Sequence, residues 1–269
     1  MKRILIILPP LLTVLAALAM LWHGPIAQFA HYNDFADEVT LFGVPNALNV
    51  FSNLGFLLLG VWGWGCLRAH AAHPPLREGW AGYRLMLLGL ILVGLGSGYY
   101  HLAPGNARLV WDRLPIALVC AGLLAAVRAE TRPGRVDMRA TLGVLLLCAV
   151  SSVLWWQFTD SAGQGDLRPY LLLQTLPLVL IPLWQAAYDA PRADRIAFGL
   201  AMAMYVLAKA AELHDRQILA ALGLISGHSL KHLLATGALA LILVRLVART
   251  HEGALRPAGT QRHPVLETI

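Results

Sequence analysis

The chain has 269 residues, of which 58% are apolar or aromatic and only 13% are charged. An ordinary soluble domain carries about 25% charged residues, so this composition excludes a water-soluble globular protein. The formal net charge is +6, but the cations stand between apolar runs and form no single basic patch, which argues against a nucleic-acid partner. The membrane is therefore the expected environment.

We predict an all-α integral membrane protein, in which one N-terminal transmembrane helix precedes a bundle of seven. A spanning helix needs about 20 mostly apolar residues. The predicted spans are Ile4–Trp22, Ala47–Leu67, Ala81–His101, Val110–Arg128, Ala140–Gln157, Pro169–Tyr188, Ile196–Leu213 and Gly227–Val247. The first apolar run is longer than that of a secretory signal peptide, which favours an uncleaved anchor. This gives an anchor over 1–30, a seven-span domain over 31–249 and a polar tail over 250–269.

Basic residues at every second boundary predict the orientation of the spans. Lys2 and Arg3 precede the first span, and arginines cluster between residues 68 and 84, 128 and 139, 192 and 195, and 245 and 256. Such loops face the cytoplasm, so both termini are expected there. The compact chain, rich in Arg and Ala, is typical of a bacterial plasma-membrane protein.

Five polar side chains are expected at one membrane depth, toward the outer side. They are Ser97, His101, Asp112, His228 and His232. Polar residues within spans usually face the bundle interior and mark functional sites. Residues four apart share a helix face, so the last two histidines can point at one ion. Zinc in catalytic sites is typically held by three protein ligands and a water, and three histidines are present here.

The neighbouring Asp112 and Ser97 suggest catalysis. The carboxylate can accept a proton from water, and the hydroxyl can donate to a developing oxyanion. Simpler interpretations stay open: Asp112 can pair with Arg113 at the interface, Ser97 can be a small packing residue, and an isolated pair of histidines more often makes ordinary hydrogen bonds.

Other polar and aromatic residues receive a structural interpretation. Trp155, Trp156 and Tyr170 are expected in the interfacial aromatic belt. Glu212, His214 and Asp215 also reach the outer face and are interpreted as loop charges, with a role in the site as the alternative.

Four motifs, FSNLGF, GSGYYH, WDRLP and HSLKH, resemble those of the alkaline ceramidase family, within the CREST superfamily of membrane hydrolases. Their order and spacing match over about residues 34–247. The resemblance implies a seven-helix fold and a zinc ion held by His101, His228 and His232. It also implies that Asp112 deprotonates water and that Ser97 assists the oxyanion. Asn49 and Ser52 would support the site from the first helix of the family fold.

The resemblance also implies a calcium site before that helix, formed by Asp34, the Phe35 carbonyl, Asp37 and Asn46. The loop has fewer acids than the family pattern, although calcium takes six to eight oxygen ligands. A solvated acidic loop, or an N-cap for the second span, explains the same residues. The extra N-terminal helix is a second departure from the family.

The resulting hypothesis is a zinc-dependent amidohydrolase that cleaves the N-acyl bond of a ceramide-like lipid, releasing a fatty acid and a sphingoid-type base. One alternative is a non-enzymatic receptor or transporter with a structural metal site, which would show a fourth protein ligand. Another is a haem or electron-transfer protein, which would need histidines flanking a porphyrin-sized gap.

Overall fold

The computed structural model describes residues 2–132 and 134–254. Within these residues the chain forms eight helical spans long and apolar enough to cross a membrane, which confirms the all-α membrane fold. The elements are α1 Lys2–His23, α2 Ala47–Phe51, α3 Leu54–Leu67, the 3-10 turn η1 Arg68–His70, α4 Pro74–Arg77, α5 Trp80–Leu102, α6 Asn106–Thr131, α7 Met138–Ser161, α8 Arg168–Ala187, α9 Arg192–Leu213, α10 Asp215–Leu222 and α11 Gly227–Ala254.

The predicted spans agree with these helices except at the last one. The second span runs over Ala47–His70, and a turn at Ser52 and Asn53 within it separates α2 from α3. The last span continues to Ala254, so the tail predicted over 250–269 begins as helix. The rest of that tail lies outside the described residues.

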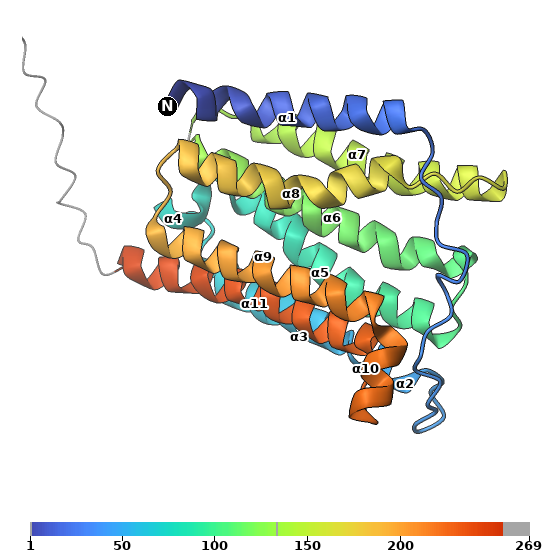
Figure 1. The fold of residues 1–269 in the computed structure, drawn as a ribbon. Helices are drawn as coiled ribbons and strands as arrows, with labels where there is room; N and C mark the ends of the chain where they lie inside the picture. Colours follow the sequence, from blue (N-terminus) through green and yellow to red (C-terminus); the bar gives the residue numbers. More distant parts are fainter. Residues whose placement is uncertain (1, 133, 255–269) are drawn as a thin grey trace, which may run out of the picture.

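The spans lie side by side with α5 and α6 in the centre (Figure 1). α1, α7 and α8 lie on one side of this pair, and α3, α9 and α11 lie on the other. In α6, 72% of the apolar stretch is buried within the protein, against 6% in α1. α6 is thus the core helix, and α1 exposes most of its surface where a membrane would surround it.

Glycines allow α5 and α6 to approach closely. A Cβ atom added at Gly82 or at Gly122 would lie 2.5 Å from a backbone nitrogen of the opposite helix. A Cβ added at Gly96 would lie 2.1 Å from the carbonyl oxygen of Trp111. Small residues at helix contacts are characteristic of membrane bundles, because they let backbones touch. The contact at Gly96 places α5 against α6 one residue before Ser97 and Asp112.

The segment between α1 and α2 crosses one end of the bundle (Figure 1). It is tied to α8 by Asp166, whose carboxylate accepts a hydrogen bond from the Ile26 backbone and forms an ion pair with Arg168. Burial alone would raise the pKa of Asp166. The hydrogen bonds from Arg168, Trp155 and the backbone outweigh that effect and hold the pKa well below its usual range.

Candidate metal centre

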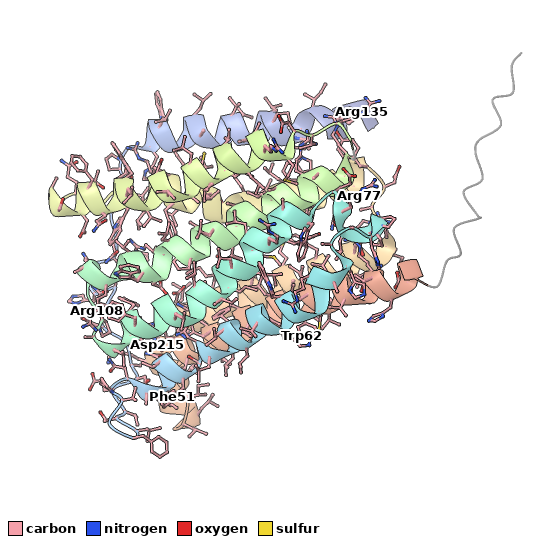
Figure 2. The ribbon with its side chains drawn as sticks, turned by 180° about the vertical axis from the view of Figure 1, so that it is seen from behind. Phe51, Trp62, Arg77, Arg108, Arg135 and Asp215 are labelled. Atoms are coloured by element: carbon pink, nitrogen blue, oxygen red, sulfur yellow. The ribbon has the colours of Figure 1, made fainter. Side chains whose placement is uncertain are left out.

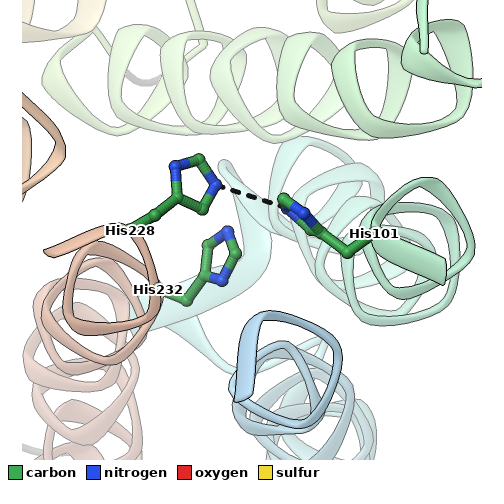
Figure 3. Close-up of side chains that lie close together, drawn as sticks. All are labelled: His101, His228 and His232. Atoms are coloured by element: carbon green, nitrogen blue, oxygen red, sulfur yellow. Dashed lines mark hydrogen bonds between the residues drawn. The ribbon is translucent and has the colours of Figure 1, made fainter. Parts of the chain in front are cut away.

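Three buried histidines meet at the end of the bundle that this segment covers. His101 comes from α5, and His228 and His232 come from α11 (Figure 3). One possible ligand atom from each lies within 4.8 Å of the other two. The Nε2 atoms of His101 and His228 are 3.3 Å apart. Imidazoles this close, aimed at one point, are arranged as in a metal site.

The ends of α5 and α11 bring these histidines together. His101 is the penultimate residue of α5, and His228 is the second residue of α11. A Cβ added at Gly227 would lie 2.1 Å from the carbonyl oxygen of Ala211, so α11 begins in backbone contact with the end of α9. The four-residue spacing then places His232 one turn further along the same face of α11.

A hydrogen-bond chain orients His232. Its Nδ1 lies 2.8 Å from the Ser52 hydroxyl, and that hydroxyl donates its own proton to the carbonyl of Asn49. Because Nδ1 is engaged by the Ser52 hydroxyl, Nε2 is the ring nitrogen of His232 that remains for a metal ion. Such contacts behind a ligand fix its tautomer and orientation. Asn53, which the sequence reasoning did not single out, also lies 3.3 Å from this Nδ1.

Asn49 acts one step further from the centre. Its side-chain oxygen accepts a hydrogen bond from the Ser229 hydroxyl at 2.7 Å, which ties α2 to α11 between the two histidines of that helix. Ser52 and Asn53, at the turn between α2 and α3, both reach His232.

Asp112 and Ser97 form a buried pair beside the histidines. A side-chain hydrogen bond joins them across the α5–α6 contact, and Asp112 also interacts electrostatically with Lys231 of α11. Arg113 also acts electrostatically on Asp112, but both residues are buried within the protein and do not lie at the interface. Arg113 is buried, donates to Gln28 at 2.6 Å and lies 4.0 Å above the Trp156 ring.

The prediction of an interfacial aromatic belt is wrong for Trp156 and Tyr170, and Arg113 explains why. Trp156 and Tyr170 are buried, and both rings face the guanidinium. A buried cation is stabilised by aromatic faces, which explains why these two rings turn inward. Trp155 remains on the surface, 45% exposed.

Glu212 and Asp215 belong to the site, so their interpretation as loop charges is wrong. Glu212 lies 4.0 Å from Nδ1 of His228 and forms a 2.9 Å ion pair with Lys231. Asp215 accepts hydrogen bonds from the backbone nitrogens of His228 and Ala36. Lys231 was not predicted at all, although its place within the HSLKH motif was a signal.

The segment before α2 covers the three histidines. The Phe35 ring packs against His101 and His228, with centroid distances of 4.8 and 4.2 Å. Asn46 donates to the backbone carbonyl of His101 at 2.9 Å. Burial raises the pKa of Tyr32 in the same segment, and the Glu212 carboxylate raises it further, so this phenol stays neutral.

The residues predicted for calcium make other contacts. Asp37 is buried and accepts from the backbone nitrogens of Asn49 and Val39, so it caps the start of α2. Asp34 is exposed and pairs with His31. The alternative of an N-cap thus describes Asp37, and calcium binding stays a prediction.

A polar cleft of about 390 Å³ adjoins this cover. Its lining residues are His31, Asp34, Leu213, Asp215, Arg216 and Gln217. Asp215 also accepts a hydrogen bond from the backbone nitrogen of His228, so this residue connects the cleft to the histidines. The labelled Asp215 and Arg108 lie at this end of the molecule, opposite to Arg77 and Arg135 (Figure 2).

The donor set fits a divalent transition metal. Within the described residues, the group that meets the ligand distances contains three histidines and no fourth acidic or cysteine side chain. Structural zinc sites use four protein ligands, whereas catalytic sites typically use three. The metal's identity is not fixed by this set, because imidazole also suits copper, iron and nickel.

No family model, no curated protein and no solved structure matches the chain.

Proposed function

We propose that this protein is a zinc-dependent membrane amidohydrolase that cleaves the N-acyl bond of a ceramide-like lipid. The observation that carries the proposal is the combination at one bundle end of three buried imidazoles with the Ser97–Asp112 pair. His101, His228 and His232 would hold the ion. When bound, zinc supplies Lewis-acid chemistry, polarising a carbonyl and making water more acidic.

The remaining chemistry falls to residues of the chain. Asp112 takes a proton from the attacking water as the water oxygen bonds to the acyl carbon and negative charge develops on the carbonyl oxygen. Asp112 then gives that proton to the amide nitrogen as the carbon–nitrogen bond breaks and the amine leaves. The products are a fatty acid and a sphingoid-type base, which balances the addition of one water. Ser97 first donates its single proton to the Asp112 carboxylate and orients it. Once Asp112 has taken the proton of water, the Ser97 hydroxyl is free to donate to the carbonyl oxygen, which is the second role that we assign to it.

The position of the site suits a lipid amide. An amide bond at the junction of headgroup and acyl chain lies near the membrane surface, and the three histidines lie near helix ends. The polar cleft beside Asp215 is suited to a headgroup rich in hydrogen-bonding groups. The acyl chain would remain among the apolar spans, so the lipid would not have to leave the membrane.

The distribution of arginines supports an orientation. Arg77 and Arg135 mark the bundle end opposite the histidines (Figure 2), and arginine-rich loops favour the cytoplasm. We therefore place both termini in the cytoplasm and the metal centre toward the outer face of a bacterial plasma membrane. Calcium at Asp34, Phe35, Asp37 and Asn46 is kept as a second proposed ion.

Hydrolysis of ceramide by the purified full-length protein, with metal analysis, tests this proposal. His101→Ala and His232→Ala should lose both the bound metal and activity, whereas Asp112→Asn should keep the metal and lose activity by roughly 10²-fold or more. His73→Ala is the matched control, because this exposed histidine precedes α4 at the opposite end (Figure 1). Full activity in the first three variants would refute the assignment.

The non-enzymatic alternative makes a different prediction. A receptor or transporter with a structural metal should hold the ion by four protein ligands and release no fatty acid from any N-acyl lipid. X-ray absorption spectroscopy of the zinc-loaded protein counts nitrogen and oxygen ligands, and comparison with Asp112→Asn shows whether a carboxylate is among them. Three imidazoles without a protein carboxylate agree with the catalytic proposal.

A further inference from the structure

Lys231 brings a positive charge to the edge of the metal centre. Its ammonium nitrogen lies 3.0 Å from Nε2 of His228 and 2.9 Å from Glu212. An ion bound to the Nε2 lone pair would take the place of the first contact and leave the ammonium beside the ion, held by Glu212. Residues three apart share a helix face, so Lys231 and His228 project from α11 in the same direction. The Lys231 side chain is 19% exposed, which makes it largely enclosed for a lysine within a span.

Glu212 holds Lys231 in this position but does not balance the local charge. Its Oε1 lies 2.9 Å from the Lys231 ammonium, and its other oxygen pairs with Lys209. Two ammonium groups thus share one carboxylate, so the three residues together carry one positive charge. Charged residues within spans are costly and usually mark binding sites. Lys209 is 47% exposed and can be hydrated, whereas Lys231 faces the histidines.

We propose that Lys231 forms a carboxylate-binding subsite at the metal centre, and that its ligand is the carboxylate of a long-chain fatty acid. The inference rests on the proposed function, because hydrolysis of an N-acyl lipid leaves the acyl carbon as a carboxylate at this place. Hydrogen bonds between ammonium and carboxylate are among the stronger ones in proteins. The acyl chain attached to this carboxylate lies among the apolar spans, as it did in the substrate.

The Lys231 ammonium also acts on the substrate, before the carboxylate product forms. Negative charge develops on the carbonyl oxygen as water attacks, and a fixed cation nearby stabilises that charge. Lys231 is therefore a specificity determinant for the acyl half of the lipid, whereas the headgroup faces the polar cleft beside Asp215.

Binding of radiolabelled oleate to the full-length protein in nanodiscs, corrected for empty nanodiscs, tests the subsite without any catalytic turnover. Lys231→Gln should weaken oleate binding by roughly tenfold or more, and Lys231→Arg should bind within about threefold of the wild type. Lys209→Gln is the matched control, because it removes the other partner of Glu212 and should also stay within about threefold. Oleyl alcohol, which has the same chain without the carboxylate, should bind all four proteins equally.

Wild-type oleate affinity in Lys231→Gln, or an equal loss in Lys209→Gln, would overturn the inference. The metal content of each variant separates a structural role of Lys231 from a role in binding. If Lys231→Gln loses the metal, oleate binding is measured on Lys231→Arg instead. A Lys231→Arg protein that holds the metal but does not bind oleate overturns the inference. If Lys231→Gln does not fold, equal affinity of the wild type for oleate and oleyl alcohol overturns it.

The carboxylate subsite and the proposed hydrolase function fail on different results. A protein that hydrolyses no N-acyl lipid but binds oleate through Lys231 refutes the hydrolase and keeps the subsite. Ceramide hydrolysis with unchanged kcat/KM and unchanged oleate affinity in Lys231→Gln refutes the subsite alone.

Discussion

Replacing Gly96 by alanine tests whether the close contact of α5 with α6 sets the geometry of the proposed reaction. The added Cβ would lie 2.1 Å from the Trp111 carbonyl oxygen, whereas ordinary van der Waals contact begins at 3.4 Å. The two backbones must therefore separate by about 1.3 Å at this point. Ser97 and Asp112 are the residues that directly follow the contact on each helix.

The expected effects follow from that displacement. Overpacking of a buried contact costs about 1–3 kcal/mol of stability, and a shift of roughly 1 Å in a reacting group can cost about 10²-fold in rate. Gly96→Ala should therefore lower the unfolding temperature and the rate of ceramide hydrolysis. It should keep its bound metal, because α5 and α11 supply the histidines and the clash lies between α5 and α6.

Gly98→Ala is the matched control for this prediction. Gly98 lies on the other side of Ser97 in the same helix, and a Cβ added there meets no atom within 4 Å. Thermal unfolding, metal content and lipid hydrolysis are measured on both variants in the same detergent. If Gly96→Ala is as stable and as active as Gly98→Ala, the reasoning from the helix contact is refuted.

Two further predictions concern the contacts that support the site. Ser52→Ala removes the hydrogen-bond partner behind His232, so metal affinity measured by chelator competition should fall about 10–100-fold. Thr175→Ala, whose hydroxyl bonds to its own helix, should not change it. Asp166→Asn should lower the unfolding temperature at pH 7, because the pKa of Asp166 is lowered in the fold and the carboxylate therefore stabilises it. The difference in unfolding temperature from the wild type should persist down to about pH 4. It should shrink only below the unfolded pKa of about 3.9. Unfolding temperatures measured from pH 7 to pH 3 check this, and a difference already lost at pH 5 would contradict it.

Local sequence was sufficient to predict the spans because hydropathy alone decides whether a helix can enter a membrane. It also grouped His101, His228 and His232, since spacing fixes the helix face and the ends of the spans fix the depth. The break at Ser52 and Asn53 was not predictable in this way, because both neighbouring stretches are apolar and read as one span.

The errors concern side chains whose partners come from other helices. Trp156 has the composition of an interfacial residue, but its direction is set by Arg113 on α6. Glu212 and Asp215 resemble loop charges in sequence, and only the packing of α9 against the start of α11 turns them toward His228. The sequence contains no signal for the rotation of one helix about its axis relative to another.

Hydrophobic length and helical period are local properties, so they are sufficient to predict a helical membrane protein and three histidines able to share an ion. The surroundings of those histidines come from packing between helices: Ser52 lies behind one ring, Phe35 over two, and Lys231 is held by Glu212 at their edge. These contacts join residues far apart in the chain, so they exist only once the backbones have packed at Gly96 and Gly227.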